Sequence, residues 1–186
     1  NHRPGDLIVV RAMIDKGDNG AYGKGIEEGG CFDILLQVAL SHTLTVTETG
    51  YATMYLGFAA AIPEGVKAYV VKEEGINDTY ISLTQVEGVL PAETGVIVEA
   101  KEGEYLFYSS YNEAADVTDN LLEGSVTDEY VAGNAYVLGN KDGIGLYKAV
   151  LNKDADGEEG TTHVKDDANK AYLPASVANG AASYSF

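Results

Sequence analysis

The stretch that decides the fold class is residues 42–48, which read His42-Thr43-Leu44-Thr45-Val46-Thr47-Glu48. Apolar and polar side chains alternate here with a period of two, and most residues are Thr or Val, which branch at Cβ. Successive side chains of a strand point to opposite faces of its sheet, so this pattern predicts a half-buried β-strand. Thr49-Gly50 ends the strand, and the apolar residues 51–58 form a second predicted strand.

Short strands separated by turns continue along the chain. The further predicted strands are residues 66–72, 79–86, 96–100, 104–108, 134–139, 143–150, 170–174 and 181–186. Their spacing of roughly 10–15 residues leaves too little room for crossover helices, which favours antiparallel pairing. The fold class predicted is all-β, an antiparallel β-sandwich, with a partly open β-barrel as the alternative.

Several connections carry more specific predictions. Residues 66–72 and 79–86 form a plausible hairpin, and Asp142-Gly143 between two apolar runs predicts another. Lys101-Glu102-Gly103 is a tight loop after which residues 104–108 return as a strand. Residues 170–174 are predicted to be a short edge strand that Pro174 ends.

The first 42 residues differ from the rest. Residues 6–14 fit a strand or a short helix, residues 17–30 are glycine-rich, and the type of the apolar run 32–40 is left open. We therefore divide the chain into an N-terminal segment, 1–42, and an antiparallel β domain, 43–186. The segment is too short to form a hydrophobic core of its own. We therefore expect that it packs on the β domain or is the remnant of a preceding domain.

The charge balance is strongly acidic. Twelve Lys and Arg face 29 Asp and Glu, for a formal net charge of −17 and a pI near 4.3. Such a field repels nucleic acids and anionic membrane surfaces, which are bound through cationic side chains. Solubility explains the excess of acids, and the alternative is binding of a cation or a basic partner.

The expected location is secreted or cell-surface. Cys31 is the only cysteine, so the chain has no internal disulfide, which favours a bacterial secreted protein over an animal one. No signal peptide is visible in the sequence, which fits a chain that is cytoplasmic or already trimmed. No run reaches the roughly 20 apolar residues of a membrane span, so direct membrane insertion is not expected.

Five phrases of the sequence carry a resemblance to a known family. They are Gly-Tyr-Ala-Thr-Met-Tyr-Leu-Gly-Phe (50–58), Ile-Pro-Glu-Gly-Val-Lys-Ala-Tyr (62–69), Leu-Pro-Ala-Glu-Thr-Gly-Val-Ile-Val (90–98), Tyr-Val-Leu-Gly-Asn-Lys-Asp-Gly (136–143) and Asn-Lys-Ala-Tyr-Leu-Pro (169–174). In order and spacing they resemble a β domain at the C-terminal ends of secreted and surface proteins of Bacteroides and Prevotella relatives. The resemblance implies an accessory module and no catalytic residues.

Patterns typical of catalysis are missing from the sequence. It contains no His-Glu-x-x-His, Cys-x-x-Cys or Gly-x-Ser-x-Gly, and its three histidines lie far apart. A pair of carboxylates for glycoside hydrolysis is the remaining enzyme alternative, because the chain has many acids. We therefore predict that the chain is not an enzyme.

Two candidate sites remain. Asp154, Asp156 and Glu158 resemble the first half of a calcium loop, although Lys165 stands where the distal glutamate belongs; the alternative is a solvated acidic loop. Tyr108 and Tyr111, at the mouth of the loop 109–123, are the best candidates to stack on a sugar ring.

The function predicted from the sequence is a noncatalytic accessory or structural module of a larger secreted or cell-surface bacterial protein, with a role in adhesion or interaction. The alternatives are a glycan-binding module that uses exposed tyrosines and a glycoside hydrolase. The expected partner is a glycan or another surface protein, and the only cofactor considered is calcium.

Overall fold

The structure is a computed structural model that describes residues 7–13, 31–37, 39–132, 135–149 and 163–186. These residues form 17 strands and no helix, and all named strand pairs are antiparallel. None of the sheets that they build closes into a barrel. The predicted all-β, sandwich-like fold is confirmed.

By its internal contacts the chain divides into two units, residues 1–40 and 41–186. In the first unit, β1 (Leu7–Met13) pairs with β2 (Cys31–Gln37) over their full length. Both segments whose type the sequence left open are therefore strands. Whether this unit is the remnant of a preceding domain stays a prediction.

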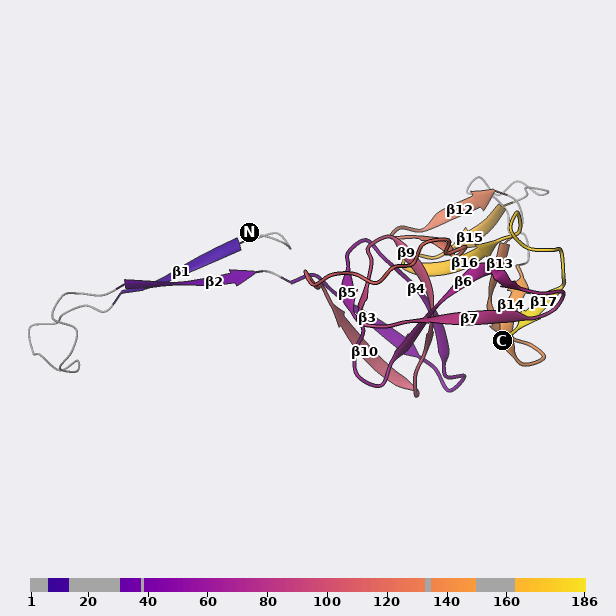
Figure 1. The fold of residues 1–186 in the computed structure, drawn as a ribbon, viewed down its shortest axis with the longest axis horizontal. Helices are drawn as coiled ribbons and strands as arrows, with labels where there is room; N and C mark the ends of the chain where they lie inside the picture. Colours follow the sequence, from indigo (N-terminus) through magenta and orange to yellow (C-terminus); the bar gives the residue numbers. More distant parts are fainter. Residues whose placement is uncertain (1–6, 14–30, 38, 133–134, 150–162) are drawn as a thin grey trace, which may run out of the picture. The chain divides into compact units, whose positions relative to one another are not determined.

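Four strands form the middle sheet of the second unit. In pairing order they are β4 (Tyr51–Leu56), β9 (Thr94–Glu99), β6 (Lys67–Ile76) and β7 (Ile81–Val86) (Figure 1). The predicted hairpin between residues 66–72 and 79–86 is confirmed as β6–β7.

Both faces of the middle sheet are buried. Val96, Ile97 and Val98 of β9 are all inaccessible to solvent. Val96 and Val98 belong to one hydrophobic cluster and Ile97 to another, as the alternation of side chains along a strand requires. A strand with consecutive buried apolar residues needs a covering layer on each side.

An outer layer covers the first cluster. It consists of β3 (Ser41–Val46) paired with β10 (Gly103–Tyr108), and of β5 (Ala60–Ala61) paired with β8 (Val89–Leu90). Leu44, Val46 and Phe107 contribute its apolar side chains to that cluster. The alternation read in residues 42–48 is the alternation of β3, whose Leu44 and Val46 are buried while Thr43 and Thr45 are exposed.

The strand after the tight loop 101–103 does not pair with β9, the strand before it. β9 already has β4 on one edge and β6 on the other, so it offers no free edge. The chain therefore crosses to the outer layer, where β10 pairs with β3 from Gly103–Val46 to Tyr108–Ser41.

A five-stranded sheet covers the second cluster. Its strands, in pairing order, are β11 (Glu123–Ser125), β16 (Lys170–Pro174), β13 (Ala135–Asn140), β14 (Ile144–Lys148) and β17 (Ser183–Ser185). Its buried residues in the cluster are Tyr136, Leu146, Leu173 and Tyr184. Figure 1 shows β10 and β14 on opposite sides of β4. A separate pair, β12 (Glu129–Ala132) and β15 (His163–Asp166), completes the unit.

Two further expectations concern this sheet. The hairpin predicted at Asp142-Gly143 is confirmed as β13–β14, and Gly143 has a φ of 117° that favours glycine. The prediction that residues 170–174 form an edge strand is wrong, because β16 lies between β11 and β13. Pro174 is tolerated there because it occupies the last residue of the strand, opposite Ala135.

We expect Gly145→Ala to destabilise the domain. A Cβ at Gly145 would lie 2.2 Å from the carbonyl oxygen of Tyr184, a backbone atom that cannot move without separating β14 from β17. The expected loss is about 2 kcal/mol or more, measured by urea denaturation. In the control Gly57→Ala the nearest atom is a methyl group of Val126 at 3.2 Å, which can rotate away. Equal stability of the two variants would contradict this packing.

Candidate functional site

Tyr108, a predicted ligand-binding residue, is held outward by a rigid strand. It is the last residue of β10, and its side chain is 54% exposed. Leu106, two residues earlier on the same face, is 41% exposed, whereas Phe107 between them is fully buried. Burial of Phe107 fixes the backbone, so the face that carries Leu106 and Tyr108 points to solvent.

Tyr111, the second predicted residue, lies in the loop that follows β10 and is 69% exposed. Two hydrogen bonds of the neighbouring residues hold this loop in place. The Ser110 N–H donates to the Ala59 carbonyl (2.8 Å), and the Asn112 N–H donates to Ser110 Oγ (3.3 Å). No strand occurs between Tyr108 and Glu123, so the predicted loop is confirmed. We call Leu106, Tyr108 and Tyr111 the aromatic strip.

The calcium candidate Asp154, Asp156 and Glu158 lies outside the described residues. Within the described part of the chain, no group of three or more His, Cys, Asp or Glu side chains is placed to hold a metal ion. Calcium binding stays a prediction.

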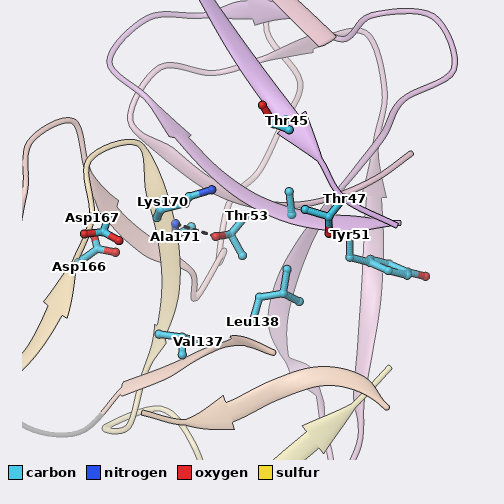
Figure 2. Close-up of a pocket in the computed structure, with 11 residues that line it drawn as sticks. Thr45, Thr47, Tyr51, Thr53, Val137, Leu138, Asp166, Asp167, Lys170 and Ala171 are labelled. Carbon is cyan, nitrogen blue, oxygen red and sulfur yellow. Dashed lines mark hydrogen bonds between the residues drawn. The ribbon is translucent and has the colours of Figure 1, made fainter. Parts of the chain in front are cut away.

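A cleft that the sequence did not predict opens beside β4. Its volume is about 350 Å³. β13 and β16 pair only at Ala135–Pro174 and Tyr136–Leu173, and beyond that point the two strands separate. Residues of the separated parts line the cleft, among them Val137 and Leu138 on β13 and Lys170 and Ala171 on β16 (Figure 2).

The remaining wall of the cleft comes from β3 and the turn after it, from β4, and from the end of β15 and the turn after it. It carries the hydroxyl groups of Thr45, Thr47 and Thr53 and the carboxyl groups of Asp166 and Asp167. The Ala171 N–H donates a hydrogen bond to Thr53 Oγ1 (3.3 Å), which ties β16 to the edge of β4. The cleft is therefore lined by β3, β4, β13, β15 and β16, and the hydrogen bond between Ala171 and Thr53 joins two of these strands without any ligand.

Asp166 is the unusual group of this cleft. Only 5% of the residue is exposed, and its Oδ2 has no hydrogen-bond partner. Burial raises the pKa of its carboxyl to about 7, and the negative charges of Glu129 and Asp167 act in the same direction, whereas a hydrogen bond from the Ser125 backbone opposes them. A buried acceptor that lacks a donor lowers the stability of the fold. Such groups are rare in folded proteins and often have a functional role.

A second cleft, of about 290 Å³, contrasts with the first. It contains Glu99, whose carboxylate already accepts hydrogen bonds from the Tyr69 hydroxyl (2.6 Å) and the Lys67 ammonium (3.2 Å). The hydrogen bond from Tyr69 holds the pKa of Glu99 below its usual value, and burial raises the pKa of Tyr69 to about 12. This carboxylate has its partners within the fold.

No protein-family model, curated protein or solved structure matches this chain. The resemblance to a β domain of Bacteroides and Prevotella surface proteins therefore stays a prediction. Among the residues that the structure describes there is no helix long and apolar enough to cross a membrane.

The raised pKa of Asp166 predicts how stability changes with pH. The folded chain keeps a proton on Asp166 up to about pH 7, whereas the unfolded chain loses it near pH 4. Stability from this group is therefore greatest below pH 4 and falls as the pH rises through 7. Asp166→Asn lacks this loss, so between pH 5 and pH 8 we expect it to gain about 2.5 kcal/mol on the wild type, roughly 5–10 °C in Tm.

Thermal melts of both proteins at the two pH values measure this difference. The control is Asp142→Asn, which removes the same charge from an exposed residue of the β13–β14 turn and should melt in parallel with the wild type. A Tm difference between Asp166→Asn and wild type that stays constant with pH would show that the carboxyl is ionised normally.

Proposed function

We propose that this chain is a noncatalytic accessory module of a larger secreted or cell-surface bacterial protein, with a role in adhesion or interaction. The observation that supports it best is the aromatic strip, in which Leu106, Tyr108 and Tyr111 are each more than 40% exposed. Adjoining exposed apolar side chains mark sites of contact with other molecules, and Leu106 and Tyr108 adjoin on one face of β10. The acidic composition and the single cysteine support the location.

The aromatic strip is a surface whose backbone and side chains lose little conformational freedom when a partner binds. Tyr108 pairs in register with Ser41 and Leu106 with Thr43, so small polar residues of β3 flank the two large side chains. A tyrosine has few rotatable bonds and presents both an apolar ring and a hydroxyl group. Since the strand already fixes the backbone, a partner would meet a surface that loses little entropy.

Glycan binding is the second candidate, and one observation favours it. The exposed Tyr111 is followed directly in the sequence by the exposed Asn112, whose amide can exchange hydrogen bonds with sugar hydroxyls. Sugar-binding sites combine these two groups: the ring stacks on C–H bonds and the amide reads the hydroxyls. A glycan would then be the partner of the aromatic strip.

Glycoside hydrolysis is the third candidate and has less support. It requires two carboxyl groups across a cleft that admits a sugar. The cleft of Asp166 and Asp167 carries two carboxyl groups, but they belong to adjacent residues at one end of it. The proposal therefore remains a noncatalytic one.

The double variant Tyr108→Ala/Tyr111→Ala tests the proposal. The full chain would be applied to a glycan array and to immobilised mucin, fibronectin and collagen. Every interaction detected with the wild type is expected to weaken at least tenfold in the double variant, because an aromatic anchor of an interface commonly contributes about 2 kcal/mol. A signal on the array alone selects the glycan candidate.

The matched control is Tyr80→Ala, which removes a tyrosine that is 47% exposed and is not part of the strip. It should bind as the wild type does. If the double variant keeps full binding, or if Tyr80→Ala loses as much, the aromatic strip is not the contact surface.

A further inference from the structure

The cleft beside β4 holds an acceptor without a donor. Asp166 Oδ2 is buried, has no hydrogen-bond partner, and belongs to a side chain that lines the cleft. Figure 2 places the Asp166 and Asp167 carboxyl groups together at one end of the cleft. A cation in the cleft would offset the cost of leaving this oxygen without a donor, because its charge acts on the whole carboxyl group.

The groups around Asp166 favour a ligand that carries a positive charge. The acids that act on its carboxyl come from several elements: Glu129 on β12, Asp128 just before β12 and Asp167 just after β15. Glu129 is paired with Asp166 in the register of β12 and β15. Together these carboxylates make a local negative potential, within a chain whose net charge is −17. A positively charged donor gains far more here than a neutral one.

Lys170 lines the same cleft, but its ammonium group does not lie against Asp166. Figure 2 shows the Lys170 side chain extending away from the two carboxyl groups, and its charge acts instead on His42 of β3, whose pKa is lowered by burial and by Lys170. On the far side, the Tyr172 hydroxyl donates to Glu123 Oε2 at 3.1 Å, and its pKa is raised by burial and by this carboxylate.

The rest of the cleft is suited to an alkyl chain. Val137, Leu138 and Ala171 provide apolar side chains, and the hydroxyl group of Thr53 lies beside Ala171, whose N–H donates to it. A volume of about 350 Å³ is at the lower end of the range for small-molecule sites. An alkyl chain that ends in a cation matches this lining, because such side chains bury their methylene groups and direct the charge to a polar end.

We propose that this cleft binds a lysine or arginine side chain of a protein partner, whose cationic end pairs with the Asp166 carboxyl while its methylene groups lie along Val137 and Leu138. This site is separate from the aromatic strip, so either can fail without the other. It would give the module a second contact with a basic partner.

The probes are two blocked tripeptides, acetyl-Gly-Lys-Gly-amide and acetyl-Gly-Arg-Gly-amide, titrated into the isotope-labelled full chain and followed by NMR. Their neutral counterparts contain norleucine and citrulline in place of lysine and arginine. The backbone signals of Val137, Leu138, Lys170 and Ala171 should shift with the basic peptides, with a Kd of roughly 1 mM, and should stay in place with the neutral ones. The stronger of the two basic peptides identifies the cation.

Two variants locate the effect. Asp166→Asn keeps the shape of the side chain and removes its charge, and should weaken binding at least tenfold. Asp142→Asn removes a charge outside the cleft and should bind as the wild type does. Binding to the wild type should also tighten from pH 6 to pH 8, as Asp166 ionises. This pH series decides the question if Asp166→Asn fails to fold.

The proposal is overturned if the basic peptides leave the signals of the cleft unchanged up to their solubility limit. It is equally overturned if the neutral peptides bind as well, or if binding is insensitive to both Asp166→Asn and pH. Calcium chloride and glucose serve as further probes. A shift of the same signals by either one, with no response to the basic peptides, would assign the cleft to that ligand instead.

Discussion

Burial of the middle sheet on both faces is the constraint from which the rest of the second unit follows. Val96, Ile97 and Val98 are fully buried and point alternately to two hydrophobic clusters. Burying each such side chain contributes roughly 1.5–3 kcal/mol, and this gain requires a layer on each side of the sheet. β10 must therefore leave β9 and join β3, and the C-terminal strands must cover the opposite face.

Both candidate sites result from this layering. The outer layer buries Phe107 and so presents Leu106 and Tyr108 to solvent. The cleft arises beside β4, where β16 is tied to β4 through Thr53, the pairing of β13 with β16 stops at Tyr136, and Thr45 of β3 also contributes to the wall. Each site thus uses the edge of a covering layer whose position the core determines, and a fixed backbone at a contact surface reduces the entropy lost on binding.

Local patterns in the sequence predict most strands and the β6–β7 and β13–β14 hairpins, but not the pairing of strands that are distant in the sequence. The alternation of residues 42–48 identified β3, and Asp142-Gly143 identified the β13–β14 turn. Alternation also places Phe107 and Tyr108 on opposite faces, so the exposure of Tyr108 was predictable. The pairing of β10 with β3 was not, because it depends on which edges of β9 are occupied, and no local pattern reports this. Asp166 is one of 29 acids in the sequence, and only its burial and its unpartnered Oδ2 distinguish it.

Methyl NOEs measured on the labelled chain show whether both faces of β9 are covered. We expect NOEs from Val96 and Val98 to Leu44, Val46 or Phe107, and from Ile97 to Leu146, Leu173 or the ring of Tyr184. If the methyl groups of Ile97 show no NOE to any residue of the five-stranded sheet, one face of the middle sheet is open and the layered arrangement is wrong.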